Sequence, residues 1–397
     1  MKKYILLLSF VLPMAAATAQ SIRPDAFPPA PDTLAPKALA MAQTVEEMYA
    51  WDKYPTYDVY VAMMQQFADS YPELCRLDTI GLSIQGRLIL SLAITGSEDN
   101  DLYRPEFLYS STMHGDEVTG FYLMLRLCDT LLRSYGTSAD ITQLLNSTRI
   151  YINPLSNPDG TYHGGDSTVA RAWRYNANRV DLNRNYPDPF GTDPLDTLQP
   201  ENKAMIEYVE QHNFRLSANL HGGSEVMNFP WDSYTSYELL NEHHDWWKAV
   251  SKRFVDTCRL VDIQRFRSVN NNGYIVGGDW YVISNGRQDY FNYYHNMREI
   301  TMELSTAKTL STTRLDHYWQ CQSHALINYI KEIHHLDDSV VVHTAQPEAH
   351  YKVYPNPTRG KVFVETLQGI HRYDLADRPA GIYFISVDGH TVKVVKQ

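Results

Sequence analysis

The chain has 397 residues, of which 44% are hydrophobic and 20% charged, so it can hold one large domain or two and bury a large core. Its formal net charge of −11 argues against nucleic acid as a partner and fits a soluble exported protein. The four cysteines match neither a zinc knuckle nor a redox pair, and their pairing cannot be read from the sequence.

The N-terminus has the parts of a secretory signal peptide. Lys2 and Lys3 precede an apolar run over residues 4–13, and small residues follow it. We therefore expect a signal peptide over residues 1–19 and a secreted or cell-surface protein. The apolar run is too short to span a membrane, and no later run is long enough, so we expect no transmembrane segment in the mature chain. A Pro-rich leader is expected over residues 20–45.

The middle of the chain has patterns of apolar residues that predict helices between strands. We expect helices over residues 56–70, 117–134, 138–146, 200–212, 236–259 and 314–336. We expect strands in a hairpin over residues 77–96, and over 105–112, 148–153, 214–220 and 299–304. Two stretches, 161–198 and 268–296, lack periodicity and are expected to be long functional loops. Helices between strands predict an α/β domain with a parallel or mixed sheet, whose sites lie at the carboxyl ends of strands.

One short motif in this region could bind a metal ion. His114-Gly-Asp-Glu117 stands where a strand-like run ends and a helix-like run begins. An imidazole and a carboxylate three residues apart on one helical turn could reach the same ion. Because so short a motif occurs by chance in many proteins, a capped helix start with a solvated Glu117 is the alternative.

Two later residues could complete such a site. His221 ends a predicted strand and precedes two glycines, so its ring could project into a cleft. Two histidines and one glutamate leave an open position on zinc for water, as in catalytic zinc sites. Glu303 lies in an apolar strand, where a carboxylate is costly to bury, and beside a metal-bound water it could act as base and acid. The alternatives are a structural histidine and an outward-facing edge-strand glutamate.

Taken in order, these motifs resemble the M14 zinc carboxypeptidase family. The resemblance covers much of residues 50–336 and rests on segments 80–87, 114–117, 157–160, 181–187, 221–223 and 301–304. It implies an α/β catalytic domain over residues 46–337, with a mixed eight-stranded sheet flanked by helices. It also implies one zinc ion held by His114, Glu117 and His221, with Glu303 as the general base and acid.

The resemblance also implies groups that bind substrate. Asn183 and Arg184 would hold the C-terminal carboxylate of a peptide, because a guanidinium fork suits a carboxylate. Arg174 would polarise the scissile carbonyl, with Arg171 as a rival of poorer spacing. Tyr281 looks like the mobile tyrosine that closes over the substrate, and Tyr274 is the runner-up.

The segment near residue 288 is most similar to the regulatory carboxypeptidase D/E/N/M branch. In that branch an acidic residue and a glutamine select C-terminal Lys or Arg, and these positions fall on Asp232 and Gln288. Asp232 could instead be a turn residue, and Arg287 stands where the branch usually has an apolar residue, so its charge could oppose a basic substrate. The resemblance implies a secreted zinc metallocarboxypeptidase that acts on peptide and protein C-termini. The alternatives are a peptidoglycan peptide carboxypeptidase or amidase, and a non-catalytic surface binding protein.

The last part of the chain has a different character. Short β segments and turns follow residue 340, which predicts a small all-β tail over residues 338–397. The tail does not fit the transthyretin-like domain of the carboxypeptidase branch. Its segments 354–360 and 381–384 resemble instead a type IX secretion sorting domain, which implies an export and surface-attachment signal read by the secretion machinery.

Overall fold

The computed structural model describes residues 39–96, 104–190, 196–295, 297–336, 352–354, 358–366, 369–387 and 390–396. The chain divides into two units, with the boundary between Ile333 and His334. The expected signal peptide, residues 20–38 of the expected leader and residues 338–351 of the expected tail lie outside the described residues. Residues 39–45, placed in the leader by the sequence, contain a short strand and the start of a helix of the first unit.

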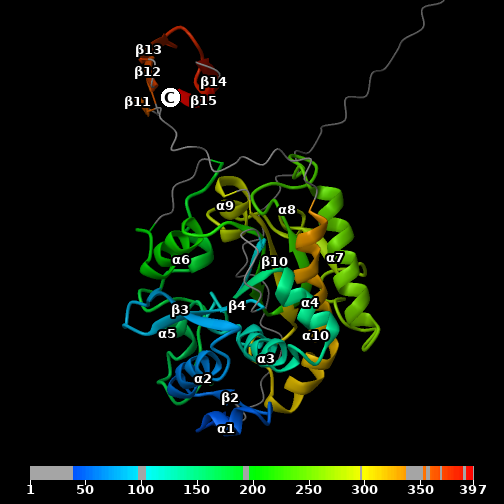
Figure 1. Ribbon diagram of the computed structural model, residues 1–397. Coiled ribbons are helices and arrows are strands. Elements are labelled where there is room, and N and C mark those ends of the chain that lie inside the picture. Colours follow the sequence, from blue (N-terminus) through cyan, green and yellow to red (C-terminus); the bar gives the residue numbers. More distant parts are fainter. Residues whose placement is uncertain are drawn as a thin grey trace, which may run out of the picture. The chain divides into compact units, whose positions relative to one another are not determined.

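A mixed eight-stranded sheet forms the centre of the first unit, as expected (Figure 1). Its strands lie in the order β3, β4, β6, β5, β7, β10, β8, β9. Their bounds are β3 Cys75–Leu82, β4 Leu88–Ile94, β6 Arg149–Asn153, β5 Glu106–Ser111, β7 Phe214–His221, β10 Arg298–Ser305, β8 Ser224–Phe229 and β9 Tyr274–Val276. Strands β6, β5, β7 and β10 run parallel, whereas β4 runs antiparallel to β3 and β6, and β8 runs antiparallel to β10.

Helices cover both faces of this sheet. The longer helices are α2 Tyr57–Ser70, α3 Thr119–Ser134, α4 Ala139–Ser147, α6 Pro200–Glu210, α7 His244–Arg259, α9 Arg287–Tyr294 and α10 Leu315–Lys331. The shorter elements are α1 Val45–Met48, α5 Pro158–Thr161, α8 Gly277–Trp280, three 3₁₀ turns at Leu182–Arg184, Thr312–Arg314 and Glu332–His335, and a small parallel pair, β1 Met41–Ala42 with β2 Tyr54–Pro55. In Figure 1, α3, α7 and α10 lie on one side of the sheet, and α6 and α9 lie on the other.

Strand β5 has large side chains on both faces of the sheet, and helices pack against each face. The Tyr109 hydroxyl donates to the Leu326 carbonyl of α10. The neighbouring Leu108 belongs to an apolar cluster on the opposite face, with Met205 of α6 and Phe291 of α9. Successive strand residues point to opposite faces of the sheet. A strand that is covered on both faces therefore has a continuous run of apolar residues in its sequence.

Two regions differ from the sequence prediction. Helix α7 begins at His244 rather than at residue 236, because Tyr237 is 98% exposed and Leu240 is 54% exposed, so no packed face forms there. The stretch 268–296 is not one long loop, since it contains β9, α8 and α9. Strand β8 is also additional to the prediction, and it exists through its pairing with β10.

The second unit consists of short antiparallel strands, as the sequence pattern predicts. Strands β11 Lys352–Tyr354, β12 Lys361–Thr366 and β13 Gly369–Asp374 form one sheet, and β14 Gly381–Val387 pairs with β15 His390–Lys396. An apolar cluster joins both sheets; its buried members are Val362, Val364, Leu375, Ile385, Val387 and Val394.

The structure also bears on the expected absence of a transmembrane segment and on the pairing of the cysteines. No helix among the described residues is both long and apolar enough to cross a bilayer. All four cysteines, Cys75, Cys128, Cys258 and Cys321, are buried free thiols.

Candidate metal centre

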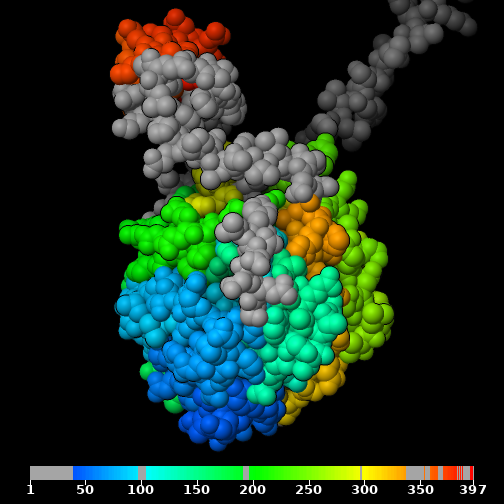
Figure 2. Space-filling model, viewed as in Figure 1, coloured from blue at the N-terminus to red at the C-terminus, as the bar shows by residue number. Residues whose placement is uncertain are grey.

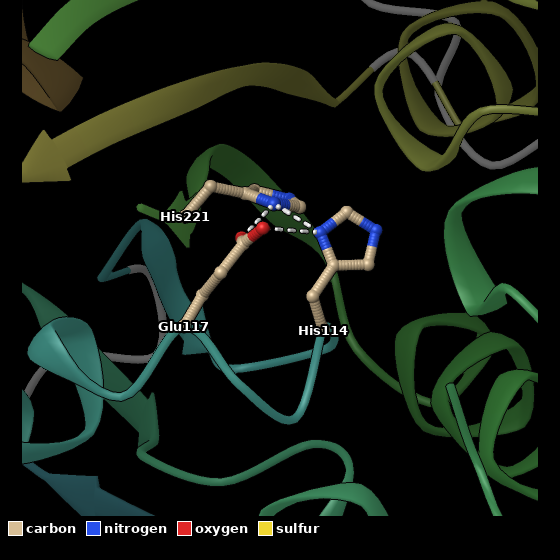
Figure 3. A group of neighbouring side chains, drawn as sticks. All are labelled: His114, Glu117 and His221. Atoms are coloured by element: carbon tan, nitrogen blue, oxygen red, sulfur yellow. Dashed lines mark hydrogen bonds and ion pairs between the residues drawn. The ribbon is translucent and has the colours of Figure 1, made fainter. Parts of the chain in front are cut away.

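The side chains of two near neighbours in sequence, His114 and Glu117, and of the distant His221 point toward one another beside the sheet (Figure 3). The Nδ1 atom of His114 lies 3.0 Å from a Glu117 oxygen, and Nδ1 of His221 lies 2.8 Å from the other oxygen. The two Nδ1 atoms are 3.0 Å apart. Each of the three residues is at most 3% exposed. Two imidazoles and one carboxylate that converge in this way form a donor set suited to zinc, with room for one further ligand.

The first two of these residues lie in a turn, not on the helix that the sequence predicts. Helix α3 begins at Thr119 after Val118, and the Glu117 N–H donates to the His114 carbonyl at 3.1 Å. His114 follows the end of β5, and His221 is the last residue of β7. His114 and Glu117 are therefore brought together by a tight turn and not by the periodicity of a helix. The third residue, His221, is placed by strand β7, at the carboxyl end of that strand.

The turn is held by the Asn157–Gly160 motif, which had no assigned role. The Asn157 amide donates to the Met113 carbonyl at 3.0 Å, and the Thr161 hydroxyl donates to the Gly115 carbonyl at 2.8 Å. Gly115 and Gly160 are in such close contact that a Cβ on Gly115 would lie 2.3 Å from the Gly160 carbonyl carbon. Only glycine fits this approach, so the motif fixes the backbone between His114 and Glu117.

A second motif without an assigned role supports the first. Asp159 accepts hydrogen bonds from the Ser83 hydroxyl and the Gln85 N–H, each at 2.8 Å, and forms an ion pair with Arg87 at 2.7 Å. All three partners belong to segment 80–87. This segment therefore acts as a scaffold for the turn that carries His114 and Glu117, two of the candidate metal-binding residues.

In both histidines the Nε2 atom, which is not the ring nitrogen that faces Glu117, lies beside a polar side chain. Nε2 of His114 lies 3.2 Å from an Asp181 oxygen, and Nε2 of His221 lies 2.7 Å from the Asn219 amide. Such partners fix the ring orientation of metal-binding histidines, here with both Nδ1 atoms facing the same point. Asp181 and Asn219 were not predicted as site residues. Asp181 could have been found from its place in the Asp181–Pro187 motif, whereas Asn219 gives no sequence signal beyond its strand.

Opposite electrostatic environments surround the two glutamates. Burial alone would raise the pKa of Glu117, but His114 and His221 outweigh it and hold that pKa well below its ordinary value. Burial, and then the charge of Glu117, raises the pKa of Glu303 well above its ordinary value. The Glu303 Oε2 atom is buried and has no hydrogen-bond partner among the described residues. The Glu303 carboxyl group is thus buried close to the charge of Glu117, with one oxygen unpaired in the part of the chain that the structure describes.

Arg174 lies beside the candidate metal-binding residues. Its Nη1 atom is 3.2 Å from Nδ1 of His114, and its Nε donates to Asp181 at 2.8 Å. Its rival Arg171 is exposed, and its alkyl chain packs against Gly164.

The two tyrosine candidates lie in different surroundings. Burial, and then the charge of Glu303, raises the pKa of Tyr281, so its hydroxyl is close enough to that carboxylate to feel its charge. Tyr281 as a whole residue is 39% exposed. Tyr274 lies on β9, and Lys252 and Arg259 of α7 are within electrostatic range of it. Of the two, Tyr281 is the one in electrostatic contact with the candidate site.

The expected carboxylate-binding pair, Asn183 and Arg184, lies within the 3₁₀ turn at residues 182–184. The Asn183 amide oxygen accepts the Arg287 N–H at 2.9 Å, which fixes the start of α9 to this turn. The Arg184 guanidinium donates to the Asn183 carbonyl at 2.8 Å. Arg184 also lies within electrostatic range of Asp232 and Tyr281.

The expected specificity residues contact each other in the interior. The Gln288 amide donates to Asp232 at 2.9 Å, and its oxygen accepts the Thr301 N–H of β10 at 2.6 Å. Asp289 accepts the backbone N–H of Asp232 at 2.8 Å. Asp232 is 3% exposed, and burial, with the charge of Asp289, raises its pKa well above the ordinary value.

The charge of Arg287 is balanced inside the fold. Its guanidinium forms two hydrogen bonds with Glu299, at 2.8 and 3.0 Å, and both side chains are almost completely buried. The expectation that Arg287 could oppose a basic substrate is therefore wrong, because a bidentate pair neutralises it.

Solved structures share this fold. Thrombin-activatable fibrinolysis inhibitor has a TM-score of 0.63 at 18% identity, over 74% of this chain and 77% of that one. Carboxypeptidase A from Helicoverpa armigera has a TM-score of 0.60 at 20% identity, over 72% of this chain and 75% of that one. At these identities the similarity shows the fold alone.

Curated relatives are more similar in sequence. Carboxypeptidase D of Rattus norvegicus is 32% identical over 295 residues, which cover 71% of this chain and 21% of that one. The chain thus spans about a fifth of the length of the carboxypeptidase D relatives it matches. The carboxypeptidase N catalytic chain of Rattus norvegicus is 30% identical over 321 residues, which cover 71% of this chain and 69% of that one. The family model described as zinc carboxypeptidase matches residues 60–325. The chain therefore belongs to the M14 zinc carboxypeptidase family.

Proposed function

We propose that this protein is a secreted zinc metallocarboxypeptidase that cleaves the C-terminal peptide bond of peptides and proteins and prefers C-terminal Lys or Arg. The observation that carries the proposal is the convergence of His114, Glu117 and His221, with Glu303 next to His221 in the sheet register. A zinc ion bound there would supply a Lewis acid that lowers the pKa of a bound water.

Glu303 is the residue that would move the proton. Its raised pKa and its unpartnered, buried Oε2 atom are properties expected of a general base that later acts as an acid. It would accept a proton from the attacking water and deliver it to the leaving amine. Arg174, fixed by Asp181, would donate to the carbonyl oxygen as negative charge develops there.

Asn183 and Arg184 would bind the terminal carboxylate of the substrate. A free carboxylate bound by a guanidinium restricts cleavage to the last peptide bond. Tyr281 would cover the bound residue, since it is partly exposed and lies within electrostatic range of Glu303 and Arg184.

The preference for Lys or Arg rests on Asp232. Within the described part of the chain no lysine or arginine forms a salt bridge with Asp232, and its side-chain partners, Gln288 and Asn228, are neutral. A buried carboxylate without an ion-pair partner is costly, and a cationic substrate side chain would supply that partner. Arg287 does not compete for this role because Glu299 holds it.

Export is proposed from the two ends of the chain. The first 19 residues have the composition of a signal peptide. Residues from His334 onward form a separate unit, and we propose that this tail is read by a secretion machinery of the type IX class.

Hydrolysis of a matched peptide set tests the proposal. The peptides differ only in their last residue, which is Arg, Lys, Phe or Glu, and each is assayed with and without a chelator. We expect chelator-sensitive release of the last residue, restored by zinc, with Arg and Lys released fastest. Release from muropeptides alone would support a peptidoglycan peptidase or amidase instead. Peptide binding without hydrolysis by zinc-loaded protein would support a non-catalytic binder.

A further inference from the structure

A second group of metal-binding side chains lies where the end of α7 meets the start of α10. Asp262 follows α7, and His317 and Cys321 lie on α10. Their donor atoms all lie within 4.8 Å of one another. Helices α7 and α10 lie side by side (Figures 1 and 2). We propose that this Asp262/His317/Cys321 group binds a divalent transition-metal ion of the zinc type, separate from the candidate active site.

The geometry at His317 fits a metal site better than a catalytic Cys–His–Asp arrangement in which cysteine is the nucleophile. Its Nε2 atom lies 3.2 Å from an oxygen of Asp262 and 3.6 Å from the sulfur of Cys321. In a Cys–His–Asp relay the imidazole uses one ring nitrogen for the nucleophile and the other for the carboxylate. Here both partners approach the same nitrogen, so the three donors converge on one point.

The two spacings from His317 are close to those of tetrahedral coordination. Bonds of about 2.0–2.3 Å at tetrahedral angles place nitrogen, oxygen and sulfur donors about 3.4–3.6 Å apart. The two observed separations from His317, 3.2 and 3.6 Å, require only small shifts, and the donors of Asp262 and Cys321 lie within 4.8 Å of each other. His317 and Cys321 are four residues apart and share one face of α10. One oxygen of Asp262 accepts the Gln264 N–H at 3.0 Å, which leaves the other oxygen facing His317.

Exposure and charge both allow an ion to enter. The side chains of His317 and Asp262 are 44% and 29% exposed, whereas Cys321 is buried at the base of the group. The nearby Arg265 forms an ion pair with Glu225 at 2.6 Å, so its charge is balanced. Imidazole, thiolate and carboxylate together suit zinc or cobalt, with water as a fourth ligand.

An ion bound by this group would connect the segment after α7 to helix α10, and α10 contacts the strand that carries Glu303. Cys321 is followed by Gln322, whose amide donates to the Leu304 carbonyl at 2.7 Å. Leu304 follows Glu303 on β10. A metal bond from Asp262 to α10 would therefore stabilise the helix that holds the end of this strand, and binding to the folded state alone raises its stability.

Cobalt titration of the metal-depleted full-length protein tests this proposal. His114, Glu117 and His221 contain no sulfur, so a thiolate-to-cobalt charge-transfer band in the near ultraviolet reports a cysteine ligand and not the candidate active site. We expect the band in the natural protein and in His221→Ala, and its loss in Cys321→Ser. In His317→Ala we expect cobalt affinity at this site to fall by at least about 10-fold.

Cys258→Ser is the matched control, because Cys258 is a neighbouring buried thiol on α7 that is not one of the three donors. It should keep the band. His317→Ala changes a partly exposed side chain, so it carries the test if Cys321→Ser does not fold. No band at saturating cobalt, a band that survives in folded Cys321→Ser, or a band lost in Cys258→Ser would overturn the proposal.

Discussion

Glu303 of β10 and His221 of β7 occupy the same register position on two adjacent parallel strands. Neighbouring strands lie about 4.8 Å apart, and residues in register point to the same face. The base candidate and one metal-binding residue are therefore positioned by the hydrogen-bond ladder of the sheet, and not by flexible loops. The remaining metal-binding residues, His114 and Glu117, reach the same point from the turn after β5.

Replacing Glu303 with Gln should abolish most activity without removing the metal. An amide cannot accept the proton of the attacking water, so kcat should fall by about 10²–10⁴-fold. Zinc content, measured on the purified variant, should equal that of the natural protein, because Glu303 is not one of the converging ligands. Near-normal turnover in the zinc-loaded variant would show that another group is the base.

The same substitution should change how the stability of the metal-free protein depends on pH. Burial raises the pKa of Glu303 in the folded state, so protonated Glu303 favours folding below the unfolded pKa near 4.5. That contribution is lost as pH rises through the folded pKa. Gln stays neutral, so the variant should gain free energy of unfolding over the natural protein by roughly 1.4 kcal/mol per pH unit within this window.

Urea unfolding in the presence of a chelator, from about pH 5 to about pH 8, measures this difference. A difference that stays constant over the range would mean that the Glu303 pKa is the same in the folded and unfolded states.

Asp181→Asn should weaken metal binding. Asp181 contacts Nε2 of His114 at 3.2 Å and forms an ion pair with Arg174 at 2.8 Å, so it orients both groups. Loss of such an outer partner typically lowers metal affinity by about 10–100-fold, which competition with a chromophoric chelator can measure. Asp166→Asn is the control, since Asp166 pairs with Arg87 at a more exposed position. Equal affinities in both variants would remove Asp181 from this role.

The chemistry of the site could be predicted from sequence because it resides in short motifs. His114, Glu117 and His221 were identified by residue type and context, and the structure brings them together. The turn at His114–Glu117 was mistaken for a helix because a three-residue spacing fits both, and the contact between Gly115 and Gly160 that decides it joins distant segments.

Elements that depend on tertiary pairing were harder to predict. Strand β9 has three residues and forms through its pairing with β8, whereas residues 236–243 have helical character but lack a surface to pack on. The balancing of Arg287 by Glu299 could not be predicted for the same reason, since Arg287 begins α9 and Glu299 lies twelve positions later on β10.

Asp232→Asn should reduce activity on basic C-termini selectively. The carboxylate is buried, is held by Gln288 and has no salt-bridge partner in the described part of the chain, so a cationic substrate side chain would gain its main countercharge there. We expect kcat/KM for Arg- and Lys-ended peptides to fall by about 10–100-fold, an effect of roughly 1.4–2.8 kcal/mol, which lies within the range for a charge-assisted contact. Peptides ending in Phe should be affected less, because they do not use the charge.

The control is Asp279→Asn, which changes a nearby exposed aspartate that accepts the Ser236 N–H. It should leave the ratio between Arg- and Phe-ended peptides unchanged. Asp232 also shares its surroundings with Asp289, so circular dichroism and thermal unfolding must show that Asp232→Asn keeps the fold. If kcat/KM fell equally for all peptides in a folded variant, Asp232 would support the loop and would not select the terminal residue. Another side chain would then determine the specificity.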